Sequence, residues 1–479
     1  MRIRVVSTAI GATAVVISIV AACGGYGGSS GMGGGVYGGS AAPTVAFSTP
    51  AAAMNVNLGQ AVKLAWTSTN ATSCTASASS MTGGTFSGSQ AVSGEMSVVP
   101  TATGSVTYTL SCSGAGGMTN ASSASVTVNP AIITQLASVT PTTIGSTIDP
   151  VTHEGNPYGL AIAPVTAGLI TAGDLIVCNF NDNGNPPVQG HGTTIVGLHP
   201  TSGATPYHIA GDAKLQGCNA VTVLPDDSIS GAAFTANMNP LVTAAGAVNT
   251  PFAADSFNGP WGEAYAAANG ANPAAIYVSN FDGSIDRIAL NGDAQTSFTK
   301  IASGFCASGS PGAIYAPAGL TYDAAIDTLY IVDTSSNSVV ALANVSAIGA
   351  GGVVVNGGCN TVASPPTPAP TFSGSAAASA RVIAHGAPLF TPLSATLLGD
   401  GNLIVTNADI NIGAGQMPNL AIEVSPVFPG GFVGSPLQLD TSSTPGALFG
   451  IVATADAQGH QIIYFNDDNT NAVMKIATP

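Results

Sequence analysis

A repeated unit runs through residues 131–479 and limits the folds that this chain can adopt. Each copy reads as a turn, an apolar strand, a polar turn, a second apolar strand that ends in Asn or Asp, and a third strand. The copies are anchored at positions 159, 219, 262, 319, 394 and 450. Repeats of about 40 to 50 residues with about four strands each are typical of β-propellers. The anchors therefore predict an all-β domain at 131–479, a six-bladed β-propeller.

Residues 44–130 carry a different β pattern. Leu64 and Trp66 alternate with small or polar residues, and so do Tyr108 and Leu110, which is the period of a half-buried strand. Clusters of Gly, Ser, Asn and Thr separate the strands. The pattern predicts a small β-sandwich. It can serve in adhesion or sugar binding, or as a spacer for the next domain. We favour the spacer, because no aromatic or charged cluster stands out.

The first 22 residues read as a signal for export. Arg2 and Arg4 precede an apolar run, Val5–Val20, that is too short for a good membrane span. Small residues follow, as expected before a cleavage site. Residues 23–43 are then a Gly-rich tether, which should behave as a flexible coil because it has no core to bury.

The end of this leader, Val20-Ala21-Ala22-Cys23, resembles the lipobox of bacterial lipoproteins, in which the cysteine becomes the acylated first residue. The resemblance implies an anchor at Cys23 with several acyl chains, which hold a protein stably where one chain is marginal. Gly24 follows, and not the Asp that favours inner-membrane retention in enterobacteria, so we expect the outer membrane or the cell surface. The alternative is an ordinary secretory signal cut nearby.

The charge composition excludes two classes of contact. The chain has 8 Lys and Arg against 23 Asp and Glu, a net charge of −15 at pH 7. Two basic residues lie in the leader, and the others are scattered at Lys63, Lys214, Arg287, Lys300, Arg381 and Lys475. So few cations cannot neutralise a nucleic-acid backbone. They also form no basic face for a membrane surface, so the lipid anchor is the predicted membrane contact.

The cysteines other than Cys23 are even in number, which indicates disulfides in an oxidising compartment. None has the spacing of zinc or haem motifs. One pair falls in the predicted sandwich, where a bridge would close a loop of about 40 residues. The four in the propeller allow three pairings. The expected bridges are Cys74–Cys112, Cys306–Cys359 and Cys178–Cys218.

Both predicted domains resemble known families. The runs Leu64–Cys74 and Tyr108–Cys112 resemble a bacterial immunoglobulin-like domain. They depart from the antibody pattern, because Trp66 precedes the first cysteine and Leu110 stands where a corner tyrosine would. The propeller unit is similar to NHL repeats and to gluconolactonase-type and streptogramin-lyase-type propellers. This resemblance implies a fold and leaves the activity open.

Gluconolactonase-type propellers hold a metal on their axis with a Glu near the first blade and with Asn or Asp just before the first strand of other blades. His153 and Glu154 resemble the first of these positions. The residues before the anchors do not follow the family: they are Tyr158, Cys218, Trp261, Ala318, Leu393 and Phe449. A divalent cation needs several oxygen ligands. The sequence therefore predicts no metal and no catalytic residue.

Polar residues at the ends of the second strands have a structural explanation, because short polar side chains bond the backbone of tight turns. One of these turns, Asn179–Gly184, partly matches a calcium loop. It lacks the glutamate that closes such a loop at its twelfth position. We predict a turn here and no cofactor, with calcium as the alternative.

Three aromatic residues, Tyr158, Trp261 and Phe449, share one register at the mouth of the predicted ring. Apolar pockets with a few polar groups are the usual ligand sites. These rings, with His153 and Glu154, are the candidate site for a carbohydrate or a hydrophobic peptide. Packing between blades is the alternative explanation.

Taken together, these features favour a non-enzymatic, lipid-anchored envelope protein. In this interpretation the sandwich spaces a propeller that binds an unidentified protein or carbohydrate at its mouth. The alternative function is a propeller enzyme of the lactonase or streptogramin-lyase type.

Overall fold

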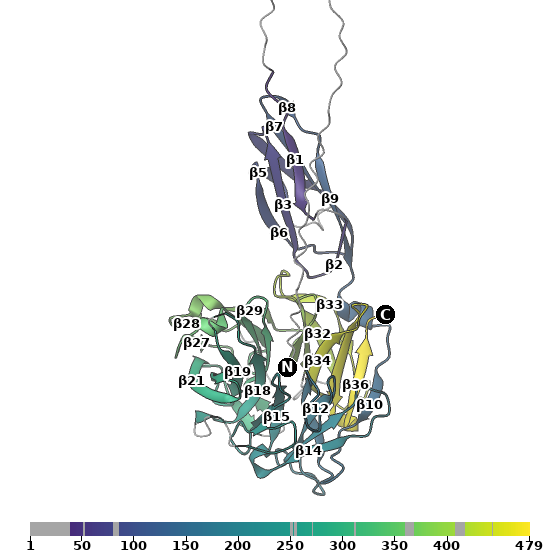
Figure 1. Cartoon of the computed structure of the whole chain (residues 1–479), viewed down its shortest axis with the longest axis vertical. Helices are drawn as coiled ribbons and strands as arrows, with labels where there is room; N and C mark the ends of the chain where they lie inside the picture. Colours follow the sequence, from purple (N-terminus) through teal and green to yellow (C-terminus); the bar gives the residue numbers. More distant parts are fainter. Residues whose placement is uncertain are drawn as a thin grey trace, which may run out of the picture. The chain divides into compact units, whose positions relative to one another are not determined.

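Nearly all regular structure in this protein is β-strand (Figure 1). The computed structural model describes residues 39–50, 53–79, 86–249, 252, 256–270, 272–310, 313–359, 368–407, 417–442 and 444–479. The predicted leader, Cys23 and most of the tether lie outside these ranges. Within them, no helix has the length and apolar character needed to cross a membrane.

The first domain is a β-sandwich, coloured purple to blue in Figure 1. Its first sheet has the order β1-β3-β6, with β1 Thr44–Thr49, β3 Val62–Thr69 and β6 Gly94–Val98. Its second sheet has the order β2-β9-β7-β4-β5, with β2 Met54–Asn57, β9 Ser122–Asn129, β7 Gly104–Gly114, β4 Ser73–Ala78 and β5 Gly88–Gln90. A short strand, β8 Gly117–Met118, pairs with β7.

The predicted alternation places the apolar side chains of both sheets in one core. Trp66 and Tyr108 are both buried, and each packs edge-on against Phe86, with ring centroids 5.7 and 5.8 Å apart. The expected Cys74–Cys112 disulfide is present. It joins residues that are directly paired in β4 and β7, so it cross-links two strands of one sheet and does not link the two sheets.

The second domain contains six sheets that are the blades of a propeller, and a two-stranded sheet of β22 Ser308–Ser310 and β23 Ala313–Tyr315. The first three begin with the orders β11-β12-β13-β14, β15-β16-β17 and β18-β19-β20-β21, and the next two are β24-β25-β26-β29 and β30-β31-β32-β33. The last is β10-β36-β35-β34. The innermost strands are β11 Gly155–Ile162, β15 Cys218–Val223, β18 Pro260–Ala266, β24 Pro317–Asp323, β30 Pro392–Leu397 and β34 Leu448–Ala455. The remaining strands are β12 Leu175–Asn181, β13 Thr194–Leu198, β14 Tyr207–Gly211, β16 Ile229–Ala233, β17 Leu241–Val242, β19 Ala274–Asn280, β20 Ile285–Asn291, β21 Ala294–Ser303, β25 Thr328–Asp333, β26 Ser338–Ala343, β29 Ala380–His385, β31 Leu403–Asn407, β32 Leu420–Val424, β33 Phe432–Gln438 and β35 Gln461–Asp467.

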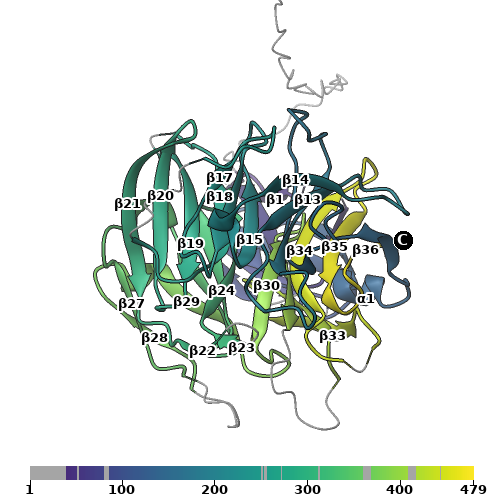
Figure 2. The same ribbon diagram turned by 90° about the horizontal axis from the view of Figure 1, so that it is seen from below.

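The blades form a closed ring. Each innermost strand contacts the innermost strand of the next blade, in the cyclic order β11, β15, β18, β24, β30, β34 and back to β11. Figure 2 shows several of these strands side by side in the middle of the domain. The ring is closed by a strand from the start of the domain, because β10 Thr142–Ser146 pairs antiparallel with β36 Ala472–Ala477. The predicted all-β, six-bladed fold is therefore confirmed.

The glycine anchors lie where neighbouring blades approach each other closely. Four of the anchors are glycines, at positions 159, 262, 319 and 450. A Cβ atom at Gly262 would stand 2.1 Å from the carbonyl oxygen of Ala318, and one at Gly319 would stand 2.7 Å from the Cα atom of Ser394. Real Cβ contacts are not this short, so the spacing of the blades itself requires glycine at these positions.

Two blades depart from the four-strand pattern. The second blade has three strands, and its last, β17, has only two residues. The third blade is widened by β27 Val353–Asn356 and β28 Thr371–Ser373, which belong to the segment between β26 and β29 of the fourth blade. The Cys306–Cys359 disulfide ties this segment to the loop after β21. The third expected bridge, Cys178–Cys218, joins the first and second blades.

Candidate functional site

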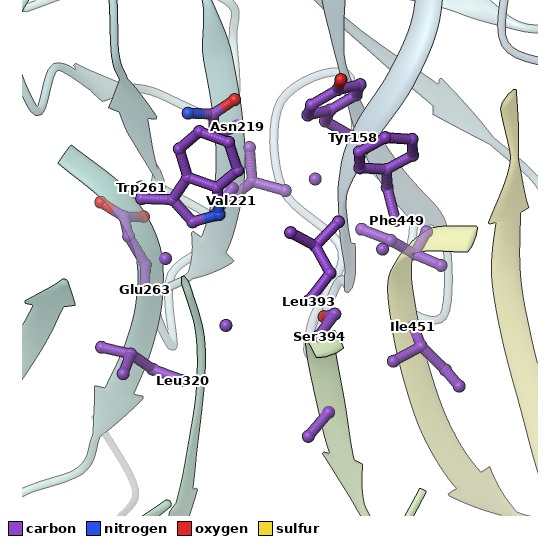
Figure 3. A pocket seen from close by; sticks show the side chains of 17 residues that line it. Tyr158, Asn219, Val221, Trp261, Glu263, Leu320, Leu393, Ser394, Phe449 and Ile451 are labelled. Atoms are coloured by element: carbon purple, nitrogen blue, oxygen red, sulfur yellow. The ribbon is translucent and has the colours of Figure 1, made fainter. Parts of the chain in front are cut away.

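The innermost strands of all six blades line a cavity on the propeller axis (Figure 3). Its volume is about 80 Å³. A water molecule takes up about 30 Å³ of liquid, and pockets for small organic ligands start at about 300 Å³. The cavity therefore has room for a few molecules of the size of water and not for a sugar or a peptide.

The predicted aromatic residues Tyr158, Trp261 and Phe449 all line this cavity, as their shared register places them. Figure 3 shows the Tyr158 and Phe449 rings next to each other, with Trp261 opposite. Tyr158 is stacked on Phe449 at a centroid distance of 3.7 Å and on Phe180 at 4.2 Å. Both faces of the Tyr158 ring are thus covered by rings from its own and the last blade.

Trp261 is also used in packing. It is 7% exposed and lies edge-on to Phe234, with a centroid distance of 5.7 Å and an angle of 90°. Its apolar cluster includes Ala318 and Leu393 from the fourth and fifth blades. A stacking platform for a sugar needs an open aromatic face, so the geometry of these rings favours packing between blades.

His153 and Glu154 are not among the residues that line the axial cavity. Glu154 is buried, and its carboxylate accepts hydrogen bonds from the backbone N and the Oγ1 of Thr193, at 2.7 and 2.9 Å. His153 is exposed, with a left-handed backbone φ of 64°. The structure thus brings the three aromatic residues together and leaves His153 and Glu154 in a loop of the first blade.

A carboxyl group outside the predicted aromatic site also lies at the cavity. Glu263 is 7% exposed, and its Oε1 accepts hydrogen bonds from Ser230 Oγ at 3.1 Å and from Asn239 Nδ2. Burial raises the pKa of Glu263 to about 8, against the opposite effect of its hydrogen-bond donors. Its position one residue after an anchor was the only signal in the sequence, and that signal does not reveal its surroundings.

A second polar residue at the cavity is Asn219, which replaces glycine at the second anchor. It is 7% exposed, and neither atom of its side-chain amide has a hydrogen-bond partner within the described chain. The Oε2 atom of Glu263 is also buried without a hydrogen-bond partner among the described residues. The axis therefore combines aromatic packing with a few polar atoms that the described residues do not satisfy.

Other carboxylates of the first blade pair with histidines. His208 Nδ1 lies 2.6 Å from Asp149, and His199 Nδ1 lies 2.5 Å from Asp174. In the part of the chain that the structure describes, no three His, Cys, Asp or Glu side chains form a group that could hold a metal ion. These pairs orient single histidines and offer no ligand set.

The calcium-loop candidate is engaged in local hydrogen bonds. Asp182 Oδ1 accepts from the backbone N atoms of Gly184 and Val188, at 3.0 and 2.8 Å. These bonds keep the pKa of Asp182 below its usual value. The amide nitrogen of Asn179 donates to Thr147 O at 3.0 Å. Both side chains therefore serve the turn and the neighbouring loop.

The other strand-end residues act partly as predicted. Asp333 accepts hydrogen bonds from the backbone N and the hydroxyl of Ser335, in its own turn. Asn466 instead donates to the backbone oxygens of Tyr158 and Gly159, at 3.2 and 3.1 Å, and so joins the last blade to the first. Asp333 therefore stabilises its own turn, as predicted, whereas Asn466 stabilises the contact between the last blade and the first.

Comparison with known proteins gives fold neighbours only. No protein-family model matches the chain, and no curated protein matches it. A catalytically inactive variant of virginiamycin B lyase from Staphylococcus aureus, solved with quinupristin, is 12% identical with a TM-score of 0.40, over 71% of this chain and 98% of that one. A streptogramin B lyase is 13% identical with a TM-score of 0.37, over 69% and 96%. A chain of a nidogen–laminin complex is 15% identical with a TM-score of 0.38, over 59% and 80%. Likenesses this distant say nothing about the activity of this chain.

Proposed function

We propose that this protein is an exported lipoprotein, anchored through Cys23 to the bacterial envelope at the outer membrane or cell surface. The support is the leader, its lipobox-like end and the Gly-rich tether. An immunoglobulin-like sandwich then spaces an NHL-like propeller, whose loops bind a protein or carbohydrate partner. The function is recognition and not catalysis.

One observation carries the non-catalytic part of this proposal: the axis is filled by aromatic packing. The rings that line the axis pack against rings of neighbouring strands: Tyr158 is stacked on Phe449, and Trp261 lies edge-on to Phe234. The cavity that remains has a volume of about 80 Å³. A substrate the size of a lactone ring or larger needs more room. Partner binding would therefore use the loop surface around the mouth.

The alternative, a lactonase or lyase, also has one observation in its favour. Glu263 lies at the cavity, and burial raises its pKa to about 8. A general acid or base works best with a pKa near the working pH. We rank this alternative second, because the cavity must widen before a substrate can reach that carboxyl.

The anchor is tested by replacing Cys23. Cells that express the wild-type chain should incorporate an alkyne-labelled fatty acid into it and retain it in the membrane fraction, because the acyl chains partition into lipid. Cys23→Ala should abolish the label and release the protein, whereas Ser29→Ala in the tether should change neither. A wild-type protein without label would show that the leader is an ordinary secretory signal.

Catalysis is tested by calorimetric titration with calcium and magnesium and by lactone hydrolysis before and after a chelator. We expect no hydrolysis above the buffer rate and no change with chelator. Metal-dependent turnover that Glu263→Gln removes would reverse the ranking of the two functions. Turnover that survives in Glu263→Gln would place the chemistry elsewhere in the chain.

A further inference from the structure

A turn of the sandwich contacts the fifth blade of the propeller. Residues 42–479 form one compact unit, and the turn between β2 and β3 supplies part of its internal contacts. Ser425 Oγ donates to the backbone oxygen of Gly59 at 2.7 Å. Asn57 Nδ2 donates to Asp400 Oδ2 at 3.0 Å, and Gln60 Nε2 donates to the backbone oxygen of Asp400 at 3.1 Å. These three side-chain hydrogen bonds hold the turn against the fifth blade.

The segment that links the two domains is held at the same place. It forms a short helix, α1 Ile132–Leu136, whose apolar residues belong to the core of the fifth and sixth blades, together with Leu58 of the turn. The backbone N of Ile133 donates to Glu423 Oε2 at 2.7 Å. Asn402 Nδ2 donates to the other oxygen, Glu423 Oε1, at 2.7 Å and reaches Leu58 O at 3.4 Å. Turn, linker and blade thus meet around Glu423 and Asp400.

These two carboxyl groups accept hydrogen bonds from neutral donors. Glu423 is 1% exposed, and Asp400 is partly buried. The groups that face them are neutral donors: the amides of Asn57 and Asn402 and the backbone of α1 and of the β30–β31 turn. None of the ion pairs among the described residues includes either carboxyl. When both are ionised, two negative charges therefore repel each other in a poorly solvated place.

The energetics of protonation agree with this geometry. Burial raises the pKa of Glu423 to about 8, and the nearby Asp400 charge raises it further against its hydrogen-bond donors. Burial also raises the pKa of Asp400. Both carboxyls therefore hold protons more tightly in the docked arrangement than they would in water.

We propose that this junction is a proton-operated hinge: turn 57–60 and helix α1 stay docked on the fifth blade while at least one of Asp400 and Glu423 is protonated, and undock when both are ionised. Undocking lets water solvate both charges, which the docked state prevents. The hinge is closed in acid and opens in alkaline solution. For a protein in contact with the external medium, this makes the attachment of the propeller sensitive to the pH outside the cell.

Hydrogen exchange on the full chain tests the hinge. The readout is the amide exchange of peptides that cover residues 55–60 and 131–136, with a peptide that covers β25 as the internal reference. Wild type is compared with Asp400→Asn at the same pH, so the intrinsic exchange rate cancels. At pH 5 the two proteins should exchange alike. At pH 9 the wild type should exchange at least tenfold faster in both junction peptides, because only it places two charges at the junction.

The control is Glu95→Gln, which removes an exposed carboxyl that pairs with Lys63 at 2.7 Å on the sandwich surface. It should exchange like the wild type at both pH values. Glu423→Gln is the second variant, and it should be as slow as Asp400→Asn at pH 9. The hinge is wrong if the wild type is no faster than both variants at pH 9, or if Glu95→Gln slows the exchange equally.

Discussion

Replacing Gly262 with alanine should lower the free energy of unfolding of the propeller by about 3 kcal/mol. The new Cβ atom would stand 2.1 Å from the carbonyl oxygen of Ala318 in the next blade. That carbonyl cannot turn away freely, because it accepts a hydrogen bond from Ser279 Oγ at 2.6 Å. The same hydroxyl accepts from the backbone N of Gly262 at 2.9 Å, so both strands are held in place. The two innermost strands must therefore move apart and break the ring contacts.

Urea denaturation followed by tryptophan fluorescence measures this effect, since Trp261 lies next to the substituted position. Gly349→Ala is the matched control. Nothing lies within 4 Å of a Cβ atom at Gly349, its φ is not in the left-handed region, and it is exposed. The control should unfold at the wild-type urea concentration. If Gly262→Ala did the same, close approach between blades would not be the reason for glycine at the anchors.

The protein should be most stable in acid and should lose stability as the pH rises from about 4 to about 8. In the folded chain, burial raises the pKa of Glu263 to about 8 from 4.5. The folded state therefore binds this proton more tightly than the unfolded state does. Its contribution is complete below the unfolded pKa and is lost as the pH rises through the folded pKa. A shift of this size corresponds to roughly 5 kcal/mol at most.

Glu263→Gln isolates this contribution. Glutamine can keep an oxygen at the position of Oε1 for Ser230 and Asn239, and it cannot ionise. The variant should match the wild type at pH 5 and should be more stable than the wild type at pH 9, as measured by urea denaturation. Part of the pH dependence should remain, because burial also raises the pKa of Asp286 and of Asp468 to about 7.

The exposed Glu95→Gln is again the control, and it should follow the wild-type curve at every pH. A wild type that is equally stable at pH 5 and pH 9 would contradict the prediction. A Glu263→Gln variant that is less stable than the wild type at pH 9 would mean that the ionised carboxylate is stabilised by its surroundings.

Local patterns determined much of this fold. Alternation at Leu64, Trp66, Tyr108 and Leu110 determined which side chains enter the sandwich core, because a strand turns every second residue to the same face. The anchors determined the number of blades, because neighbouring strands come too close there for most side chains. The Cys74–Cys112 disulfide could be paired from the sequence because these are the two cysteines of the predicted sandwich. The four propeller cysteines allow three pairings, and the tertiary structure decides among them.

Other features were decided by contacts between residues far apart in the chain. The pairing of β10 with β36 joins residues 142 and 475, and no local pattern specifies the partner of an edge strand. The partners of Glu263 come from the second blade, and those of Glu423 come from the linker helix and from a distant turn of its own blade. The aromatic mouth is filled because Phe180, Tyr158 and Phe449 meet face to face. The sequence alone determined the strands and the number of blades, since these depend on spacing along the chain. Only the tertiary structure decided the closure of the ring and the protonation of its buried carboxyls, because burial and electrostatic fields depend on every neighbour in space.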